Sequence, residues 1–373
     1  MKTRAAILRE PNTPWSVEEI ELDDPVAGEI LVKTLAAGMC HSDEHAHDGT
    51  MPAPFPLVGG HEGAGVVQAT GPGVTEFEVG DHISCSFIPS CGKCRWCASG
   101  QQNLCDLGAH LMEPEMMAGG FRHHSAAGED LSAFLKLGTF AEHMVVSVDS
   151  AIKIAPDIPA GPAALVSCGV TTGYGSAVNR AEVTPGDTVV IVGCGGLGHA
   201  AVQGAAVAGA KNVVAVDPSE FKQESAMEFG ATHRAGSMEE ATEIVGQLTL
   251  GVMADSVILT PSVLTGDLIA PAQFLTRKGG TVVATAVAPA MQMDVQLNLF
   301  EFAMMNKQLR GCLFGSTAPR QEIPHILSMY QAGQIKLDEM ITNTYTLDHL
   351  NEGYQDMLDH KNVRGIITFD PSD

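Results

Sequence analysis

The sequence predicts an α/β protein of two domains, one mostly β and the other built on a doubly wound parallel sheet. The chain has 373 residues, which is long for a single core. Its first part, residues 1 to about 173, is rich in Gly, Pro and short β-branched runs such as Glu29–Lys33. From about Pro185, continuous apolar runs alternate with helical segments. That alternation is typical of parallel strands covered on both faces.

The composition excludes several classes of function. Hydrophobic residues make up 45% of the chain and charged residues 17%, as in a globular protein. A formal net charge of -23 repels phosphate backbones and anionic lipids, so neither nucleic acid nor a membrane is an expected partner. The start, MKTRAAILREPNTPW, lacks a long apolar core. We therefore expect a cytoplasmic protein whose nine cysteines serve metals or packing.

In the first domain, the run CGKCRWCASGQQNLC holds four closely spaced cysteines, namely Cys91, Cys94, Cys97 and Cys105. Short gaps let one loop fold its thiolates around a single tetrahedral ion, so the spacing predicts a structural zinc site. Disulfides are disfavoured because the chain has no secretory signal at its start. Bacterial ferredoxins share C-x2-C-x2-C but continue with x3-C-P, whereas Asp106 follows the last cysteine here. Zinc is therefore favoured over an iron–sulfur cluster.

The second domain opens with a dinucleotide-binding pattern. A strand candidate at Thr188–Val192 leads into a glycine-rich turn and a small-residue helix, and a second strand at Val213–Val216 closes on Asp217. The residues of the turn are Gly193, Gly195, Gly196, Leu197 and Gly198. This unit predicts a Rossmann domain; an ordinary glycine turn followed by a surface aspartate is the alternative.

Each part of the pattern has a physical role. Gly193 permits the tight turn, Gly195 lets the backbone approach a diphosphate, and Gly198 lets the helix pack against the sheet. The diphosphate is expected at the helix N-terminus, where free N–H groups and the helix dipole favour negative charge. A carboxylate at Asp217 can accept hydrogen bonds from ribose hydroxyls and repels a 2′-phosphate, so NAD is favoured over NADP.

Further residues of the types that bind metals, cysteine and histidine, are scattered through the first domain. Cys40 lies in CHSDEH, His61 in GGHEGAG, and Cys168 in SCGVTTGYGSA. Their spacing alone does not show that they meet, and isolated buried cysteines and histidines are usually packing residues.

In combination, these motifs resemble those of the zinc-dependent medium-chain alcohol dehydrogenases. The resemblance rests on Cys40-x-Ser42-Asp43, Gly60-His61-Glu62-Gly63-x-Gly65, the four-cysteine run, Cys168-Gly169-x-x-Thr172-Gly173 and the glycine turn, in the family's order. It covers nearly the whole chain. It implies a GroES-like catalytic domain over residues 1–173 and 317–373, with its zinc lobe at about 90–106, and a Rossmann domain over 174–316.

The resemblance also implies the roles of individual residues. Cys40, His61 and Cys168 would bind a catalytic zinc, with Glu62 beside it as an occasional ligand and Asp43 orienting His61. An alcohol would be oxidised to an aldehyde or ketone by hydride transfer to NAD. Ser42 would bind the alcohol oxygen, and the proton would reach His45 through the cofactor ribose.

Other positions follow from the same resemblance. Thr172 would contact the nicotinamide, Lys222 the adenosine ribose, and Arg364 the diphosphate. His41 replaces an arginine that many members place on the diphosphate, so the grip on the cofactor is expected to depend on pH. The family lines its substrate pocket at positions that correspond to Phe87, Phe134 and Leu135.

Within the family, the chain resembles the bacterial nicotinoprotein branch, whose NAD stays bound and is reoxidised by an external acceptor. The phrases PWSVEEIEL, FIPSCGKC, NLCDLGA, CGVTTGYGSAV and GYQDML carry this resemblance. The alternatives are a thiol-dependent formaldehyde dehydrogenase, a conventional dehydrogenase with dissociable NAD, and a noncatalytic zinc and NAD binding protein. The family forms closed homo-oligomers, so a homo-oligomer is expected.

Overall fold

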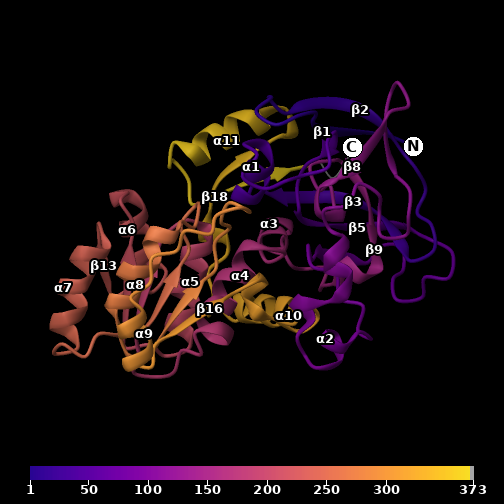
Figure 1. Ribbon diagram of the computed structural model, residues 1–373. Helices are drawn as coiled ribbons and strands as arrows, with labels where there is room; N and C mark the ends of the chain where they lie inside the picture. Colours follow the sequence, from indigo (N-terminus) through magenta and orange to yellow (C-terminus); the bar gives the residue numbers. More distant parts are fainter. Residues whose placement is uncertain (370–373) are drawn as a thin grey trace. The chain divides into compact units, whose positions relative to one another are not determined.

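The computed structural model describes residues 1–369, which form two compact units (Figure 1). The first unit comprises Met1–Cys168 and the chain from Ala318 onward, and the second comprises Gly169–Thr317. The domain boundaries expected from the sequence, after residues 173 and 316, stay predictions. The mixed α/β fold class with a parallel sheet is confirmed.

The first unit is built mainly from two β structures, as its sequence texture predicted. Among the described residues, one is a closed barrel with the strand order β1 (Lys2–Leu8), β2 (Ser16–Leu22), β7 (His123–Ser125), β8 (Asp130–Ala133) and β4 (Leu57–Val58). The other is a sheet with the order β10 (Ala151–Lys153), β6 (His82–Cys85), β5 (Glu62–Thr70), β3 (Glu29–Gly38), β18 (Arg364–Thr368) and β17 (Ile341–Tyr345), in which β9 (His143–Ser147) also pairs with β3.

Short helices complete this unit. They are α1 (His41–His47), α2 (Arg95–Ala98), α3 (Ala160–Leu165), α10 (Pro319–Gln331) and α11 (Leu350–Leu358). The central strand β3 determines where the site forms. Its last residue, Gly38, lies opposite Glu62 of β5 on one side and Ile366 of β18 on the other. The end of β3 therefore delivers Cys40 to the start of β5, where His61 and Glu62 lie.

The second unit contains a parallel sheet covered by helices. Within the described chain, its strand order is β13 (His233–Ala235), β12 (Asn212–Val216), β11 (Thr188–Val192), β14 (Ala254–Leu259), β15 (Thr276–Ala284) and β16 (Gln308–Gly311). This is the 3-2-1-4-5-6 order of a Rossmann fold. The helices are α4 (Gly169–Gly175), α5 (Gly196–Val207), α6 (Glu220–Glu228), α7 (Met238–Leu248), α8 (Ile269–Leu275) and α9 (Leu299–Met304).

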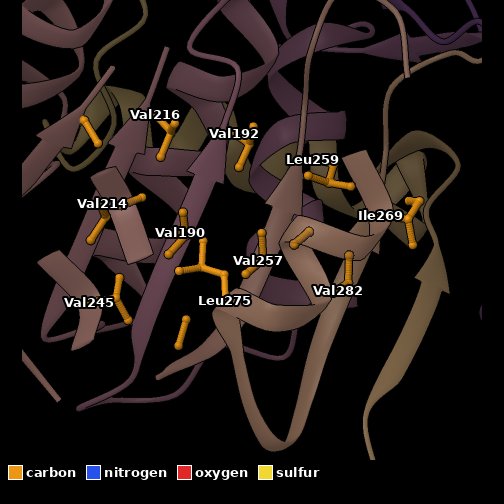
Figure 2. Close-up of a cluster of buried hydrophobic side chains, with 14 residues drawn as sticks. Val190, Val192, Val214, Val216, Val245, Val257, Leu259, Ile269, Leu275 and Val282 are labelled. Atoms are coloured by element: carbon orange, nitrogen blue, oxygen red, sulfur yellow. The ribbon is translucent and has the colours of Figure 1, made fainter. Parts of the chain in front are cut away.

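The core of the second unit explains why its strands read as continuous apolar runs. Every residue of β11 and β12 is buried, because helices cover the sheet. Figure 2 shows Val190, Val192, Val214 and Val257 on the strands of the sheet; together with neighbouring side chains they form one apolar cluster. Burial of such side chains contributes about 1.5–3 kcal/mol each.

No helix among residues 1–369 combines the length and the apolar character needed to cross a membrane.

Candidate active site

One set of metal-ligand side chains comes together in the first unit. The Sγ atoms of Cys40 and Cys168, a ring nitrogen of His61 and a carboxylate oxygen of Glu62 all lie within 4.8 Å of one another. All but the half-buried Cys40 are buried. Two thiolates and an imidazole suit zinc, and a catalytic zinc needs three protein ligands with a further position left for water or substrate. The residues named from the sequence therefore form one centre that fits the metal.

Asp43 lies beside His61, the residue that the resemblance expects it to orient. Its Oδ2 lies 3.1 Å from Nδ1 of His61, and its Oδ1 accepts a hydrogen bond of 3.0 Å from the backbone N–H of Gly60. A proton held at Nδ1 by a carboxylate leaves the lone pair on Nε2, the nitrogen that binds a metal. Neither ring nitrogen of His61 makes a regular hydrogen bond to the described residues, and since Nδ1 faces the carboxylate of Asp43, Nε2 is the nitrogen left for an ion.

The side chains at the centre favour the metal-binding state of one of its two thiols, that of Cys40. A hydrogen bond from Cys168 lowers the pKa of Cys40 well below its ordinary value, and this outweighs burial. Burial alone would lower the pKa of His61, but the charges of Asp43 and Cys40 raise it well above its ordinary value. The buried anions therefore attract one proton or one cation to this place, and a zinc ion satisfies them directly.

Glu62 and Arg364 form a fully buried ion pair at the same centre. Arg364 Nη2 also donates a hydrogen bond of 3.2 Å to the backbone oxygen of Met39, next to Cys40. Burial raises the pKa of Glu62 to about 7 even though Arg364 opposes the shift. The structure thus shows Arg364 at the metal centre, and the expected contact with a diphosphate stays a prediction.

Helix α1 carries the remaining predicted catalytic residues. It begins after Cys40, whose extended backbone caps the helix. The Sγ of Cys40 lies 3.7 Å from the Oγ of Ser42, a weak hydrogen-bond contact, so Ser42 lies beside the metal centre. His45 is buried one turn further on, and its ring lies 6.2 Å from that of His41. The helix brings Ser42 to the metal centre; the proton relay from Ser42 to His45 stays a prediction.

Two of the three predicted pocket residues contact the metal ligand itself. The rings of Phe134 and Phe87 lie 5.6 and 6.0 Å from the ring of His61, both edge-on. Leu135 is buried next to Phe134 in the chain. Apolar rings at a zinc ligand exclude water and would favour an apolar alcohol, although the pocket assignment stays a prediction.

The second metal-ligand set is the four-cysteine lobe. The Sγ atoms of its cysteines lie within 4.8 Å of one another, with 4.0 Å between Cys91 and Cys97 and between Cys94 and Cys105. A tetrahedron with Zn–S bonds of about 2.3 Å has S···S edges of about 3.8 Å, so the observed spacing fits zinc. Backbone N–H groups also donate to the sulfurs, and the one from Cys97 chiefly lowers the pKa of Cys94 to about 6.

The glycine turn in the second unit has the expected form. Gly193 has a φ of +95°, and a Cβ at Gly198 would overlap the backbone oxygen of Gly193. A Cβ at Gly195, by contrast, would meet nothing within 4 Å. Gly195 therefore borders open space at the N-terminus of α5, where a diphosphate fits. Among the described residues, the buried Oγ1 of Thr172 also lacks a partner, as expected if a ligand supplies one.

Asp217 ends β12 beside this turn. Its Oδ2 accepts a hydrogen bond of 2.8 Å from the backbone N–H of Cys194, and its Oδ1 accepts one of 2.9 Å from Ser219. Each carboxylate oxygen keeps a further lone pair that a ribose hydroxyl can use. Lys222 is buried in the first turns of α6, and its proposed contact with the ribose stays a prediction.

Sequence reasoning missed His199, one residue after the glycine run. The only signal was a histidine in a helix otherwise made of small and apolar residues, and such a histidine usually only packs. Of the cysteines left without a role, Cys85 lies in an apolar cluster, where burial raises its pKa to about 12. Cys194 is also buried, with its Sγ 3.6 Å from the backbone oxygen of Val216.

Comparisons with known proteins agree with this geometry. The sequence matches two protein-family models. Residues 26–157 match that of the alcohol dehydrogenase GroES-like domain, and residues 196–332 match that of the zinc-binding dehydrogenases. Alcohol dehydrogenase B of Mycobacterium tuberculosis is 48% identical over 374 residues, covering 100% of both chains. The NDMA-dependent alcohol dehydrogenase of Amycolatopsis methanolica is 48% identical over 367 residues, covering 98% of this chain and 99% of its own. Benzyl alcohol dehydrogenase from Acinetobacter calcoaceticus superposes with a TM-score of 0.92 at 26% identity, over 99% of this chain and 100% of its own.

Proposed function

We propose that this chain, which belongs to the zinc-dependent medium-chain alcohol dehydrogenase family, keeps its NAD bound throughout the cycle and returns the hydride to an external acceptor. The chain is a zinc alcohol dehydrogenase with a catalytic and a structural zinc site. The observation that carries the finer proposal is the whole-length similarity to a relative that depends on NDMA. A dependence on an added compound is expected of an enzyme whose NAD cannot exchange with a free pool.

The residues at the first-unit centre supply the proton chemistry. When bound, zinc lowers the pKa of the substrate hydroxyl, and NAD accepts the hydride. Ser42, which lies beside Cys40, accepts the hydroxyl proton and passes it toward His45 on the same helix. Asp43 keeps His61 in the tautomer that binds metal, and the rings of Phe87 and Phe134, which pack edge-on against His61, help to exclude water.

The proposed cycle has a kinetic signature. If the nucleotide stays bound, the aldehyde or ketone formed from the alcohol must leave before the acceptor enters to take the hydride. Two half-reactions that share one form of the reduced enzyme give ping-pong kinetics. A conventional dehydrogenase, in contrast, forms a ternary complex and releases NADH in every turnover.

The test uses the purified holoenzyme without added nucleotide. Denatured protein should release close to one NAD(H) per chain. Oxidation of benzyl alcohol should then proceed with NDMA as acceptor, and initial rates at varied alcohol and NDMA should give parallel double-reciprocal lines. Protein that elutes without nucleotide and reduces added NAD at steady state would instead be a dehydrogenase with dissociable NAD.

Two other readings make different predictions in the same assay. A thiol-dependent formaldehyde dehydrogenase would oxidise formaldehyde only when a thiol is added, because its substrate is the thiol adduct. A noncatalytic zinc and NAD binding protein would show no turnover with any alcohol although both metals and NAD are bound. The weak hydrogen bond between Ser42 and Cys40 disfavours the noncatalytic reading, since binding alone requires no hydroxyl at the ligand.

We also propose that the chain forms a homo-oligomer in the cytoplasm. Strand β16 is the last strand of its sheet among the described residues, so one of its edges is open to pairing. The segment before it exposes large apolar side chains, with Met291, Met293 and Phe300 exposed by 86%, 89% and 71%. A second copy of the same edge can cover both features at once. Nine free cysteines suit a reducing compartment.

A further inference from the structure

His199 is joined to the glycine turn by its own side chain. It lies in the first turn of α5 and is fully buried. Its Nδ1 lies 3.0 Å from the backbone oxygen of Gly195, and its Nε2 lies 2.9 Å from the Oγ of Ser225 in α6. The ring of Phe229 packs edge-on against it at 5.0 Å. One imidazole therefore links the turn to the helix that follows the ribose-binding strand.

The partners determine which ring nitrogen carries the proton. A carbonyl oxygen can only accept, so Nδ1–H must donate to Gly195, and Nε2 must then accept from the Ser225 hydroxyl. Burial lowers the pKa of His199 to about 4, so the ring stays neutral at ordinary pH and keeps this single tautomer. The bridge is thus directional, from Ser225 through His199 to Gly195.

The bridge controls a donor that the cofactor needs. The oxygen of Gly195 accepts two hydrogen bonds from His199, one of 2.9 Å from its backbone N–H and one of 3.0 Å from Nδ1. In a planar trans peptide, the C=O and the next N–H point in opposite directions. Holding the Gly195 oxygen therefore also holds the Gly196 N–H, which is one of the free donors at the start of α5.

A second bridge holds the other side of the same turn. The N–H of Cys194 donates to Asp217, whose other oxygen accepts from Ser219 at the start of α6. Successive residues of the turn, Cys194 and Gly195, are thus both tied to the β12–α6 region. A Cβ added at Gly195 would meet no atom within 4 Å, so this tied part of the turn borders open space.

We propose that His199 is a positioning residue for NAD: it fixes the Gly195 peptide so that the Gly196 N–H is presented to the cofactor diphosphate. A donor that is already oriented loses little freedom on binding, which lowers the dissociation rate. That His199 raises the affinity for NAD does not depend on the proposed function. That it helps to keep NAD bound throughout the cycle does rest on the proposed function.

The test compares His199→Leu with Ser225→Ala and with a matched control. His199→Leu removes both side-chain hydrogen bonds of His199, so the Gly196 N–H is no longer held toward the diphosphate. NAD(H) should then leave the holoenzyme about tenfold faster or more, since one hydrogen bond from an N–H to a charged diphosphate is worth roughly that factor. Ser225→Ala should give a smaller increase. The control is His123→Leu, which replaces another fully buried neutral histidine in the first unit and should leave release unchanged.

If His199 had a purely structural role, His199→Leu would weaken the binding of ADP and of adenosine alike; the positioning role predicts a difference between them. In nucleotide-free protein, His199→Leu should weaken ADP binding but leave adenosine binding unchanged, because only ADP carries the diphosphate. The proposal would be overturned if His199→Leu released NAD(H) at the wild-type rate, or if His123→Leu released it as fast as His199→Leu does. If His199→Leu does not fold, Ser225→Ala decides the matter with the same readouts. If the wild type itself releases NAD quickly, the proposed permanent retention of NAD is wrong. The role of His199 is still tested in that case, by comparing the dissociation constants of NAD for the wild type and for His199→Leu.

Discussion

At the scale of single residues, buried neutral histidines should make the protein sensitive to acid. Burial is the main reason that the pKa of His123 is lowered from 6.5 to about 4. Between those values the unfolded chain binds a proton that the folded chain does not, so stability falls as the pH falls. From pH 6.5 to pH 5 the loss is about 2 kcal/mol for this residue.

The variant His123→Leu isolates this effect. Urea unfolding at pH 7.5 and pH 5 should show a smaller loss of stability in the variant than in the wild type, by about 2 kcal/mol. Protonation of the zinc ligands weakens both proteins in the same way and cancels in the difference. Equal losses in the two proteins would contradict the buried, neutral state of His123.

The candidate site could be predicted from the sequence only where its residues are neighbours in the chain. Cys91 to Cys105 lie on one loop, so their spacing alone indicated a metal. Cys40, His61 and Cys168 are brought together by the pairing of β3 with β5 and by the end of α3, and this register cannot be read from spacing. Only the resemblance to a family joined them. His199 went unnoticed because its partner Ser225 lies 26 residues away in the sequence.

At the scale of elements, the turn before α5 separates glycines needed for folding from a glycine needed for binding. Gly195 has φ −75° and ψ −168°, which alanine can adopt, and a Cβ there meets no atom within 4 Å. Gly195→Ala should therefore fold normally but occupy space that the diphosphate needs. We expect NAD affinity to fall by on the order of tenfold or more, with the melting temperature unchanged.

Gly198→Ala is the matched change with the opposite outcome. Its Cβ would overlap the oxygen of Gly193 and lie 3.2 Å from Oγ1 of Thr260, so helix and turn must separate. Stability should drop by about 1–3 kcal/mol, as in other overpacked cores. Calorimetry and NAD titration on both variants check the pair. Equal melting temperatures for the two variants would show that the turn is looser than the structure indicates.

The two metal-binding elements should also separate under mutation. Cys94→Ser removes a ligand from the lobe and should lower the melting temperature together with the zinc content, because a structural zinc site contributes folding energy. Cys168→Ser removes a ligand from the buried centre and should abolish turnover while the lobe keeps its ion. Elemental analysis should give two zinc ions per wild-type chain and about one in each variant. Similar losses of stability and activity in both variants would argue against separate roles.

The elements themselves were predicted unevenly. The strand, turn, helix and strand from Thr188 to Val216 were found from the sequence because each strand is a continuous apolar run bounded by turn residues. The barrel of the first unit could not be predicted in detail, since strands as short as Leu57–Val58 carry no period. Its mostly β character followed from composition alone.

At the scale of the whole molecule, the net charge of -23 opposes the association that we propose through the exposed apolar segment. Two copies repel one another over a distance set by the salt concentration. The Debye length is about 30 Å at 0.01 M and about 8 Å at 0.15 M. Apolar contact between the segments around Phe300 acts only at short range and is barely weakened by salt. Association should therefore tighten as salt is raised, the reverse of an interface held by ion pairs.

Sedimentation equilibrium at the two salt concentrations measures this directly. We expect the dissociation constant of the oligomer to fall on the order of tenfold at the higher salt. Phe300→Asp adds a charge to the apolar segment and should give monomers, whereas Leu250→Asp changes an apolar side chain that is 94% exposed in another loop and should leave assembly intact. An oligomer that dissociates as salt rises, or that survives Phe300→Asp but not Leu250→Asp, would mean that the copies meet through a different surface. The open edge of β16 would then need another explanation, because an uncovered strand edge invites uncontrolled pairing.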